Sequence, residues 1–181
     1  MTAERSEVTG SPAGTSWVKL EKEALNVLNE LWAKISARER LMVYGAAVVG
    51  LGVLVGMILG TKSYGAYGIS ISVNYFTAEN AGLFALLALV GAIATLAVIY
   101  LHVAPNMNIT WPAPYAKILM GVAFATAACA ILIVLMQLIR AGGFGPEPPI
   151  FMYVADVAVI AGGALLAYAA YLDWTASKTV V

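Results

Sequence analysis

The chain has 181 residues, of which 61% are hydrophobic and 11% are charged, and its formal net charge is zero. This balance provides no basic face of the kind that a nucleic-acid ligand requires. A mean hydropathy of +0.85 is too apolar for a water-soluble domain, whose surface helices keep one polar face. These values predict an integral membrane protein that is surrounded by the lipid bilayer and has no nucleic-acid partner.

The N-terminal segment, residues 1–15, is predicted to be a disordered tail because it is rich in Ser, Thr, Gly and charge. Residues 16–35 then follow a helical period, with apolar and polar residues on opposite sides. The apolar side carries Trp17, Leu20, Leu28, Leu31 and Trp32. Such an amphipathic helix either lies flat on the membrane surface or docks on a partner protein, and both alternatives stay open.

The first apolar span covers residues 41–60, and about 20 apolar residues suffice to cross a bilayer. Ser36 and Glu39 precede it with the Ser-x-x-Glu pattern of a capping box, which predicts that the helix begins there. Glycines recur along one side of this span, at Gly45, Gly52, Gly56 and Gly60. Membrane helices associate through close contact at small residues, so this stripe is predicted to pack on a neighbouring helix or on a second copy of the chain.

The connection over residues 61–80 contains a run, residues 69–75, that alternates strictly between apolar and polar side chains. A period of two predicts a strand, and here a short hairpin or an extended lid entered through the glycines of residues 64–68. The second span covers residues 81–103. Near its end lies His102, the one histidine, which is expected to anchor the span at the membrane interface rather than to bind a ligand.

The third span covers residues 116–139 and the fourth covers residues 150–172. Small and weakly polar residues share one face of each span and include Gln137 on the third, and Gly163 and Ala167 on the fourth. These two faces are predicted to meet inside the bundle. Cys129, the one cysteine, lies among alanines in the middle of the third span and is expected to be a small packing residue.

Asp156 is the one ionisable residue well inside a predicted span. A charged side chain in hydrocarbon is costly unless it is paired or neutral, which makes an intramembrane carboxylate a candidate functional residue. Because the third and fourth spans are antiparallel, Gln137 and Arg140 are expected near its depth. Two interpretations stay open: a structural clamp between the two helices, or a proton, ion or ligand site.

The sequence contains no HExxH or CxxC pattern, no GxSxG elbow and no P-loop. Metal binding and nucleophilic catalysis therefore lack the residues that they require. The sequence predicts no enzymatic activity, no metal and no cofactor.

The distribution of cations predicts how the chain crosses the membrane. Most of the Lys and Arg residues precede the first span: Arg5, Lys19, Lys22, Lys34, Arg38 and Arg40. An excess of Lys and Arg marks the cytoplasmic side, and four spans return the chain to the side on which it began. We therefore expect a multi-pass protein of the cell membrane with both termini in the cytoplasm, and residues 176–181 as a short tail.

Three short motifs lie in the region of residues 36–175: Arg40-Leu-Met-Val-Tyr-Gly-Ala46, Ser72-Val-Asn74 running into Gly82-Leu-Phe-Ala-Leu-Leu-Ala88, and Ala161-Gly-Gly-Ala-Leu-Leu166. With these motifs the region resembles a group of small four-span membrane proteins of unknown function, common in actinobacteria. The group implies neither an activity nor catalytic residues. Its first span ends in a Leu-Pro-Trp-Tyr type of sequence, whereas this chain has Gly60-Thr-Lys-Ser-Tyr64.

The expected fold is all-α: a bundle of four transmembrane helices preceded by an amphipathic N-terminal helix. Few buried polar residues and several small-residue faces favour a non-enzymatic accessory or assembly subunit of a larger membrane complex, or a homo-oligomer. The alternative is a small transporter or channel component that uses Asp156. That function requires polar groups along a continuous face, and hence several copies of so small a chain.

Overall fold

A computed structural model describes residues 13–66, 69–74, 80–104, 110–141 and 149–178. Its elements are α1 (Ala13–Lys34), α2 (Ala37–Leu59), β1 (Thr61–Ala66), β2 (Ile69–Asn74), α3 (Asn80–Val103), α4 (Tyr115–Ala141) and α5 (Ile150–Lys178). The chain divides into two units, Met1–Ile35 and Ser36–Val181.

The first unit consists of α1 in its described part. This helix begins at Ala13 rather than at residue 16, and residues 1–12 of the predicted tail lie outside the described part of the chain. Leu20 and Leu28 are exposed on α1, so the helix carries apolar side chains that it cannot cover by itself.

Four helices of the second unit are long and apolar enough to cross a membrane, which confirms the four predicted spans: Ala37–Leu59, Ala81–Val103, Tyr115–Ile139 and Ile150–Ser177. The last helix, α5, continues to Lys178, so residues 176–178 belong to the helix and not to the predicted tail. The residues after Leu172 include no glycine or proline that would end it. The fall in hydropathy there marks the edge of the apolar span rather than the end of the helix.

The capping box at the start of α2 is confirmed. The backbone N–H of Ser36 donates to the Glu39 carboxylate at 2.8 Å, and the backbone N–H of Glu39 donates to the Ser36 hydroxyl at 3.2 Å. Both groups lack a partner within the helix, and the two side chains supply one to each. The start of the first transmembrane helix is thus determined by residues that lie next to one another in the sequence.

The strand predicted over residues 69–75 is confirmed for residues 69–74, and residue 75 lies outside the described part of the chain. This strand is β2, which pairs antiparallel with β1 from Thr61↔Asn74 to Ala66↔Ile69. The residues expected to lead into the hairpin are partly within it, because Tyr64, Gly65 and Ala66 belong to β1. The Asn74 side chain donates to the Met57 carbonyl at 2.7 Å and so attaches the hairpin to the last turns of α2.

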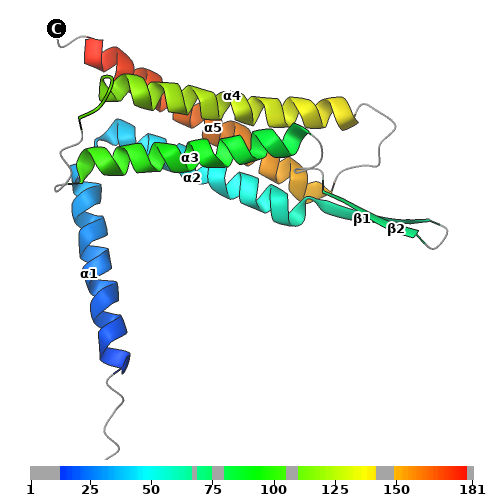
Figure 1. Ribbon diagram of the computed structural model, residues 1–181, viewed down its shortest axis with the longest axis horizontal. Coiled ribbons are helices and arrows are strands. Elements are labelled where there is room, and N and C mark those ends of the chain that lie inside the picture. The colour runs from blue at the N-terminus through cyan, green and yellow to red at the C-terminus, as the bar shows by residue number, and fades with distance from the viewer. Residues whose placement is uncertain (1–12, 67–68, 75–79, 105–109, 142–148, 179–181) are drawn as a thin grey trace, which may run out of the picture. The chain divides into compact units, whose positions relative to one another are not determined.

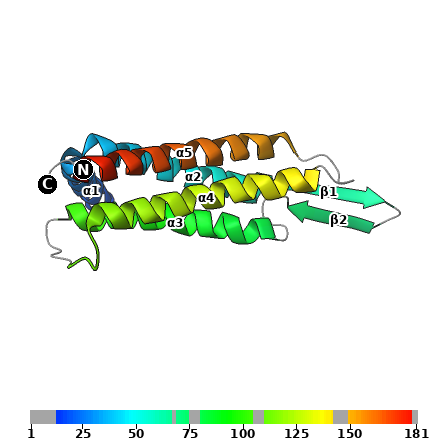
Figure 2. The same ribbon diagram turned by 90° about the horizontal axis from the view of Figure 1, so that it is seen from above.

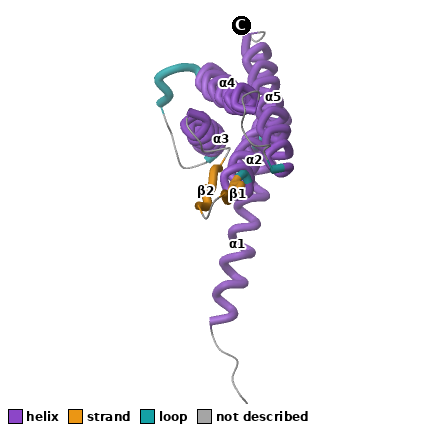
Figure 3. The backbone as a smooth tube through the Cα atoms, turned by 90° about the vertical axis from the view of Figure 1, so that its right-hand side faces the viewer, coloured by secondary structure: helices purple, strands orange, loops and turns teal. Residues whose placement is uncertain are grey.

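The four spans form a closed ring in which α2 contacts α3 and α5, and α4 contacts α3 and α5 (Figures 1 and 2). The tube in Figure 3 shows α3 beside α4 and α2 beside α5. Successive spans run in opposite directions, so the hairpin and the end of α4 lie at the same end of the bundle (Figure 2). We call this the hairpin end, and the other the opposite end.

Alanines make up more than half of the buried apolar residues, beside larger ones such as Met42, Ile99 and Leu166, whereas many other large apolar side chains face outwards. Ala46, Ala85, Ala88, Ala123, Ala130 and Ala169 are buried, and Leu51, Leu86, Ile93, Ile131 and Val154 are exposed. Lipid solvates large apolar side chains well, so burying them in the bundle brings little, while small residues let the helix backbones approach closely.

Candidate functional site

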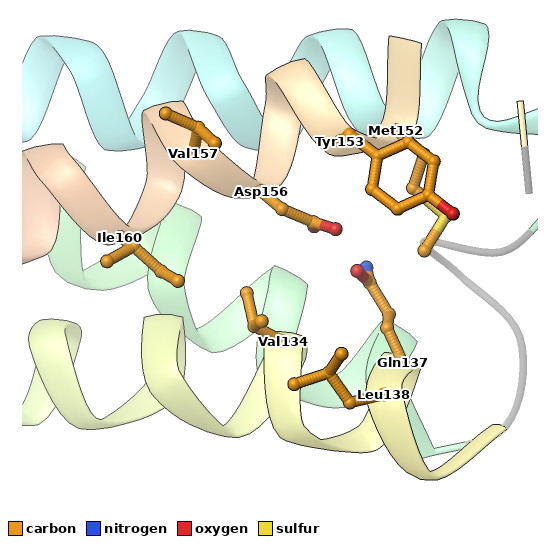
Figure 4. A pocket seen from close by; sticks show the side chains of 8 residues that line it. All are labelled: Val134, Gln137, Leu138, Met152, Tyr153, Asp156, Val157 and Ile160. Atoms are coloured by element: carbon orange, nitrogen blue, oxygen red, sulfur yellow. The ribbon is translucent and has the colours of Figure 1, made fainter. Parts of the chain in front are cut away.

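Asp156 and Gln137 form a buried polar pair near the hairpin end. Asp156 follows the start of α5 by six residues and Gln137 precedes the end of α4 by four, which places them about 9 Å and about 6 Å from those helix ends. Their exposed fractions are 9% and 4%. With the Gln137 amide oriented to donate, its nitrogen lies 2.6 Å from each carboxylate oxygen of Asp156. Figure 4 shows the two side chains pointing toward each other between α4 and α5.

Close packing of α4 on α5 holds the pair together. Gly163 lies seven residues after Asp156, on the same side of α5. A Cβ atom at Gly163 would lie 3.2 Å from the Ala130 Cβ of α4, so the two helices are in tight contact at this point. Ala167, one turn further on, is half-buried. The side chain of Arg140, the third predicted member of the site, lies outside the described part of the chain.

A groove of about 210 Å³ opens beside the pair, lined by Val134, Gln137, Leu138, Met152, Tyr153, Asp156, Val157 and Ile160 (Figure 4). Leu138 and Val157 on its walls are 62% and 68% exposed. The groove therefore opens on the outward surface of α4 and α5, which in a membrane-spanning bundle faces lipid. Its walls are apolar, and the polar atoms are concentrated at Asp156 and Gln137.

Two other buried polar side chains within the spans, Thr95 and Thr126, are satisfied inside their own helices. The Thr95 hydroxyl donates to the Gly91 carbonyl at 2.9 Å, and the Thr126 hydroxyl donates to the Val122 carbonyl at 2.8 Å. Such bonds leave no free donor for a neighbouring group. These threonines therefore do not continue the polar site of Asp156 along the bundle.

A second polar cluster lies at the opposite end. The Tyr115 hydroxyl donates to the Glu39 carboxylate at 2.7 Å, and Glu39 is only 7% exposed. The Tyr115 ring stacks on His102 with 3.8 Å between ring centroids and 13° between ring planes. The cluster thus connects the start of α2, the end of α3 and the start of α4. The sequence assigned Glu39 only to the helix cap and His102 only to the membrane interface.

The glycine stripe of α2 faces α5 at two of its positions. A Cβ atom at Gly45 would lie 2.9 Å from the Gly162 carbonyl oxygen, and one at Gly52 would lie 2.9 Å from the Val159 side chain. Gly56 is buried, and Gly60 ends the helix by donating its N–H to the Gly56 carbonyl at 2.9 Å. At Gly45 and Gly52 the geometry matches packing within one chain, the first of the two predicted alternatives.

Sequence reasoning did not identify Gly162 as the packing partner of Gly45, nor Gly91 as a contact residue. A Cβ atom at Gly91 would clash with the Thr126 hydroxyl, so this glycine is a point of close contact between α3 and α4. Single glycines in a helical pattern signal close packing, but they do not indicate which helix is the neighbour.

The other predicted residues have less to contribute. Leu31 and Trp32 on α1 are half-buried, the side chain of Trp17 lies outside the described part, and docking of α1 stays a prediction. Cys129 is half-buried in α4. Among the described residues, no group of three His, Cys, Asp or Glu side chains could hold a metal ion.

The four apolar helices in the described part of the chain define the class of the molecule, a multi-pass helical membrane protein. Comparison with protein-family models, with curated proteins and with solved structures found no match for this chain. The resemblance to four-span actinobacterial proteins stays a prediction.

Proposed function

We propose that this chain is a non-enzymatic membrane subunit that binds another membrane protein through the groove between α4 and α5. The observation that carries the proposal is the position of the Asp156–Gln137 pair, beside a groove that opens on the lipid-facing surface. A polar group bordering lipid is costly without a partner, and hydrogen bonds between helices are one of the forces that join membrane helices. Asp156 is 9% exposed, and a second membrane helix in the groove would cover that remaining part.

A transporter or channel component is the second candidate, and the intramembrane carboxylate of Asp156 is what favours it. Transport needs polar groups along a continuous pathway. In the described part of the spans, Thr95 and Thr126 donate to their own helices and do not extend the site of Asp156. Such a pathway would have to form between several copies of the chain, which makes this function the less supported of the two.

We further propose that both termini lie in the cytoplasm, because most cations precede the first span and the number of spans is even. In a Cys129→Ala background, single cysteines at Thr9 and Ser177 should resist an impermeant thiol reagent in intact cells. A cysteine at Ser70, in the hairpin, should react. Labelling of either terminus from outside would overturn this orientation.

Photo-cross-linking in cells tests the function. A photoreactive amino acid replaces Val157 on the wall of the groove, and in a second variant it replaces Leu87 on α3. Both residues are exposed and each lies seven residues after the start of its helix, so they sample the same depth. Val157 should give a discrete cross-linked protein of constant mass, and Leu87 should give lipid adducts without such a band.

The proposal fails if the two positions give the same products, or if Val157 yields lipid adducts alone. Purified protein in vesicles provides the complementary measurement. If it carries a proton or cation flux that Asp156→Asn abolishes, and Val157 gives no protein cross-link, the transporter function replaces the one proposed here.

A further inference from the structure

The Asp156 carboxylate has more acceptor positions than the Gln137 amide has donor hydrogens. An ionised carboxylate has about four acceptor positions, and a glutamine amide nitrogen has two hydrogens. The Gln137 nitrogen lies 2.6 Å from both oxygens and thus supplies a neutral donor to a charged group. Gln137 also contributes its own carbonyl oxygen, so the pair as a whole is rich in acceptors. A cationic donor is the group that complements it best in a medium of low dielectric constant.

The described basic residues of the spans are too far away to act as that donor. Lys117 lies on α4, twenty residues before Gln137, which corresponds to about 30 Å along the helix. Arg38 and Arg40 lie in the first turn of α2, also at the opposite end of the bundle. None of these described side chains neutralises Asp156, and a cation that does so has to come from elsewhere, such as a helix of another protein.

The size of the groove indicates what kind of group enters it. Pockets for small molecules usually enclose about 300–1,000 Å³, and a cavity of about 150 Å³ accepts a benzene ring. The groove has about 210 Å³ and so accommodates a group about as large as one long side chain. Its apolar walls at Val134, Leu138 and Val157 suit the methylene stem of a lysine or an arginine, whose charged end would then reach Asp156.

We propose that the groove receives one Lys or Arg side chain from a transmembrane helix of a partner protein, which forms an ion pair with Asp156 within the membrane. Gln137 orients the carboxylate, and the walls of the groove exclude lipid from the pair. The inference rests on the proposed function and adds the chemistry of the partner: a helix with a single cation about two turns below its end on the hairpin side.

The test uses the full-length chain in phosphatidylcholine vesicles and synthetic Leu/Ala transmembrane peptides, with association measured by energy transfer. One peptide carries a lysine seven residues from its end, and its matched control carries leucine there. The lysine peptide should bind at least tenfold more tightly than the leucine peptide. Asp156→Asn should abolish this difference, because an amide keeps the hydrogen bond to Gln137 but not the charge.

Further variants separate binding from folding. Val157→Trp fills the groove without changing the charge and should also weaken binding of the lysine peptide, while Arg140→Gln should leave it unchanged. The thermal stability of each variant in detergent shows whether the bundle is intact. For Asp156→Asn and Val157→Trp we expect unfolding temperatures close to that of the unmodified chain.

Three results with the peptides, and one with a small amphiphile, would overturn the inference. The lysine and leucine peptides could bind equally, the preference for lysine could survive Asp156→Asn, or the preference could require Arg140→Gln, which would make Arg140 the cation. If dodecylammonium binds in a way that depends on Asp156 and the lysine peptide does not bind, the groove is a site for a small cationic amphiphile instead. If one of these results is found while position 157 still cross-links to a protein, only the further inference fails and the proposed function stands. If the cross-link is also absent, the proposed function fails as well.

Discussion

Gly162→Val is expected to destabilise the bundle by about 3 kcal/mol or more, a large fraction of the free energy of unfolding of a typical protein. A Cβ atom at Gly162 would lie 2.8 Å from the Val49 backbone nitrogen and 2.9 Å from the Gly45 carbonyl oxygen. Both neighbours are backbone atoms of α2, so no side chain can rotate away, and α2 and α5 would have to separate. Unfolding in mixed micelles, followed by circular dichroism, measures the change.

Gly121 provides the matched control. It lies on the exposed side of α4, and a Cβ atom there would have no neighbour within 4 Å. Gly121→Val should therefore change stability by about 0.5 kcal/mol or less. Equal losses for the two variants would mean that α2 and α5 are not in backbone contact, and the glycine stripe of α2 would then be free for a second copy of the chain.

Glu39→Ala is expected to cost about 2–4 kcal/mol, because the substitution removes two interactions at once. The Ser36 N–H loses its acceptor in the capping box, and such a hydrogen bond contributes about 0.5–1.5 kcal/mol. The hydroxyl of the half-buried Tyr115 also loses its acceptor, and an unsatisfied buried group costs about 1–3 kcal/mol. Glu30→Ala, at an exposed position of α1, should have little effect and controls for the removal of one negative charge.

A double-mutant cycle with Tyr115→Phe isolates the hydrogen bond, because phenylalanine keeps the ring that stacks on His102. Hydrogen bonds to charged groups contribute about 1.5–3 kcal/mol, and the coupling energy between positions 39 and 115 should fall in that range. A coupling energy close to zero would show that the two residues act independently and that Glu39 serves only as the helix cap.

The position of Asp156 illustrates how far the sequence predicts a site in a membrane bundle. The apolar spans determined the number of helices, and alternation of their direction brought Gln137 to the depth of Asp156. The helical period places Gln137 on the same face of α4 as Ala130, and Asp156 on the same face of α5 as Gly163. Both residues therefore lie on the sides of α4 and α5 that face each other. The depth of a residue in the membrane and the helix face on which it lies are properties of a single helix, so both can be predicted from the sequence.

The groove beside the pair could not be predicted in the same way. It depends on how closely α4 and α5 approach at Gly163 and Ala130, and on which walls, such as Leu138 and Val157, remain outside that contact. The volume left between two helices is a property of their packing. The same holds for the link between Glu39 and Tyr115, residues separated by 76 positions in the chain.

The sequence by itself determined four apolar spans, the capped start of α2 at Ser36 and the strand of the hairpin, because lipid solvation, capping and strand alternation act over short stretches of chain. Only the tertiary structure decided that Gly45 lies against Gly162, that Glu39 binds Tyr115 and that Asp156 borders a groove open to lipid. Small residues permit close contact with any helix, so the choice of neighbour depends on how all four helices fill the bundle together.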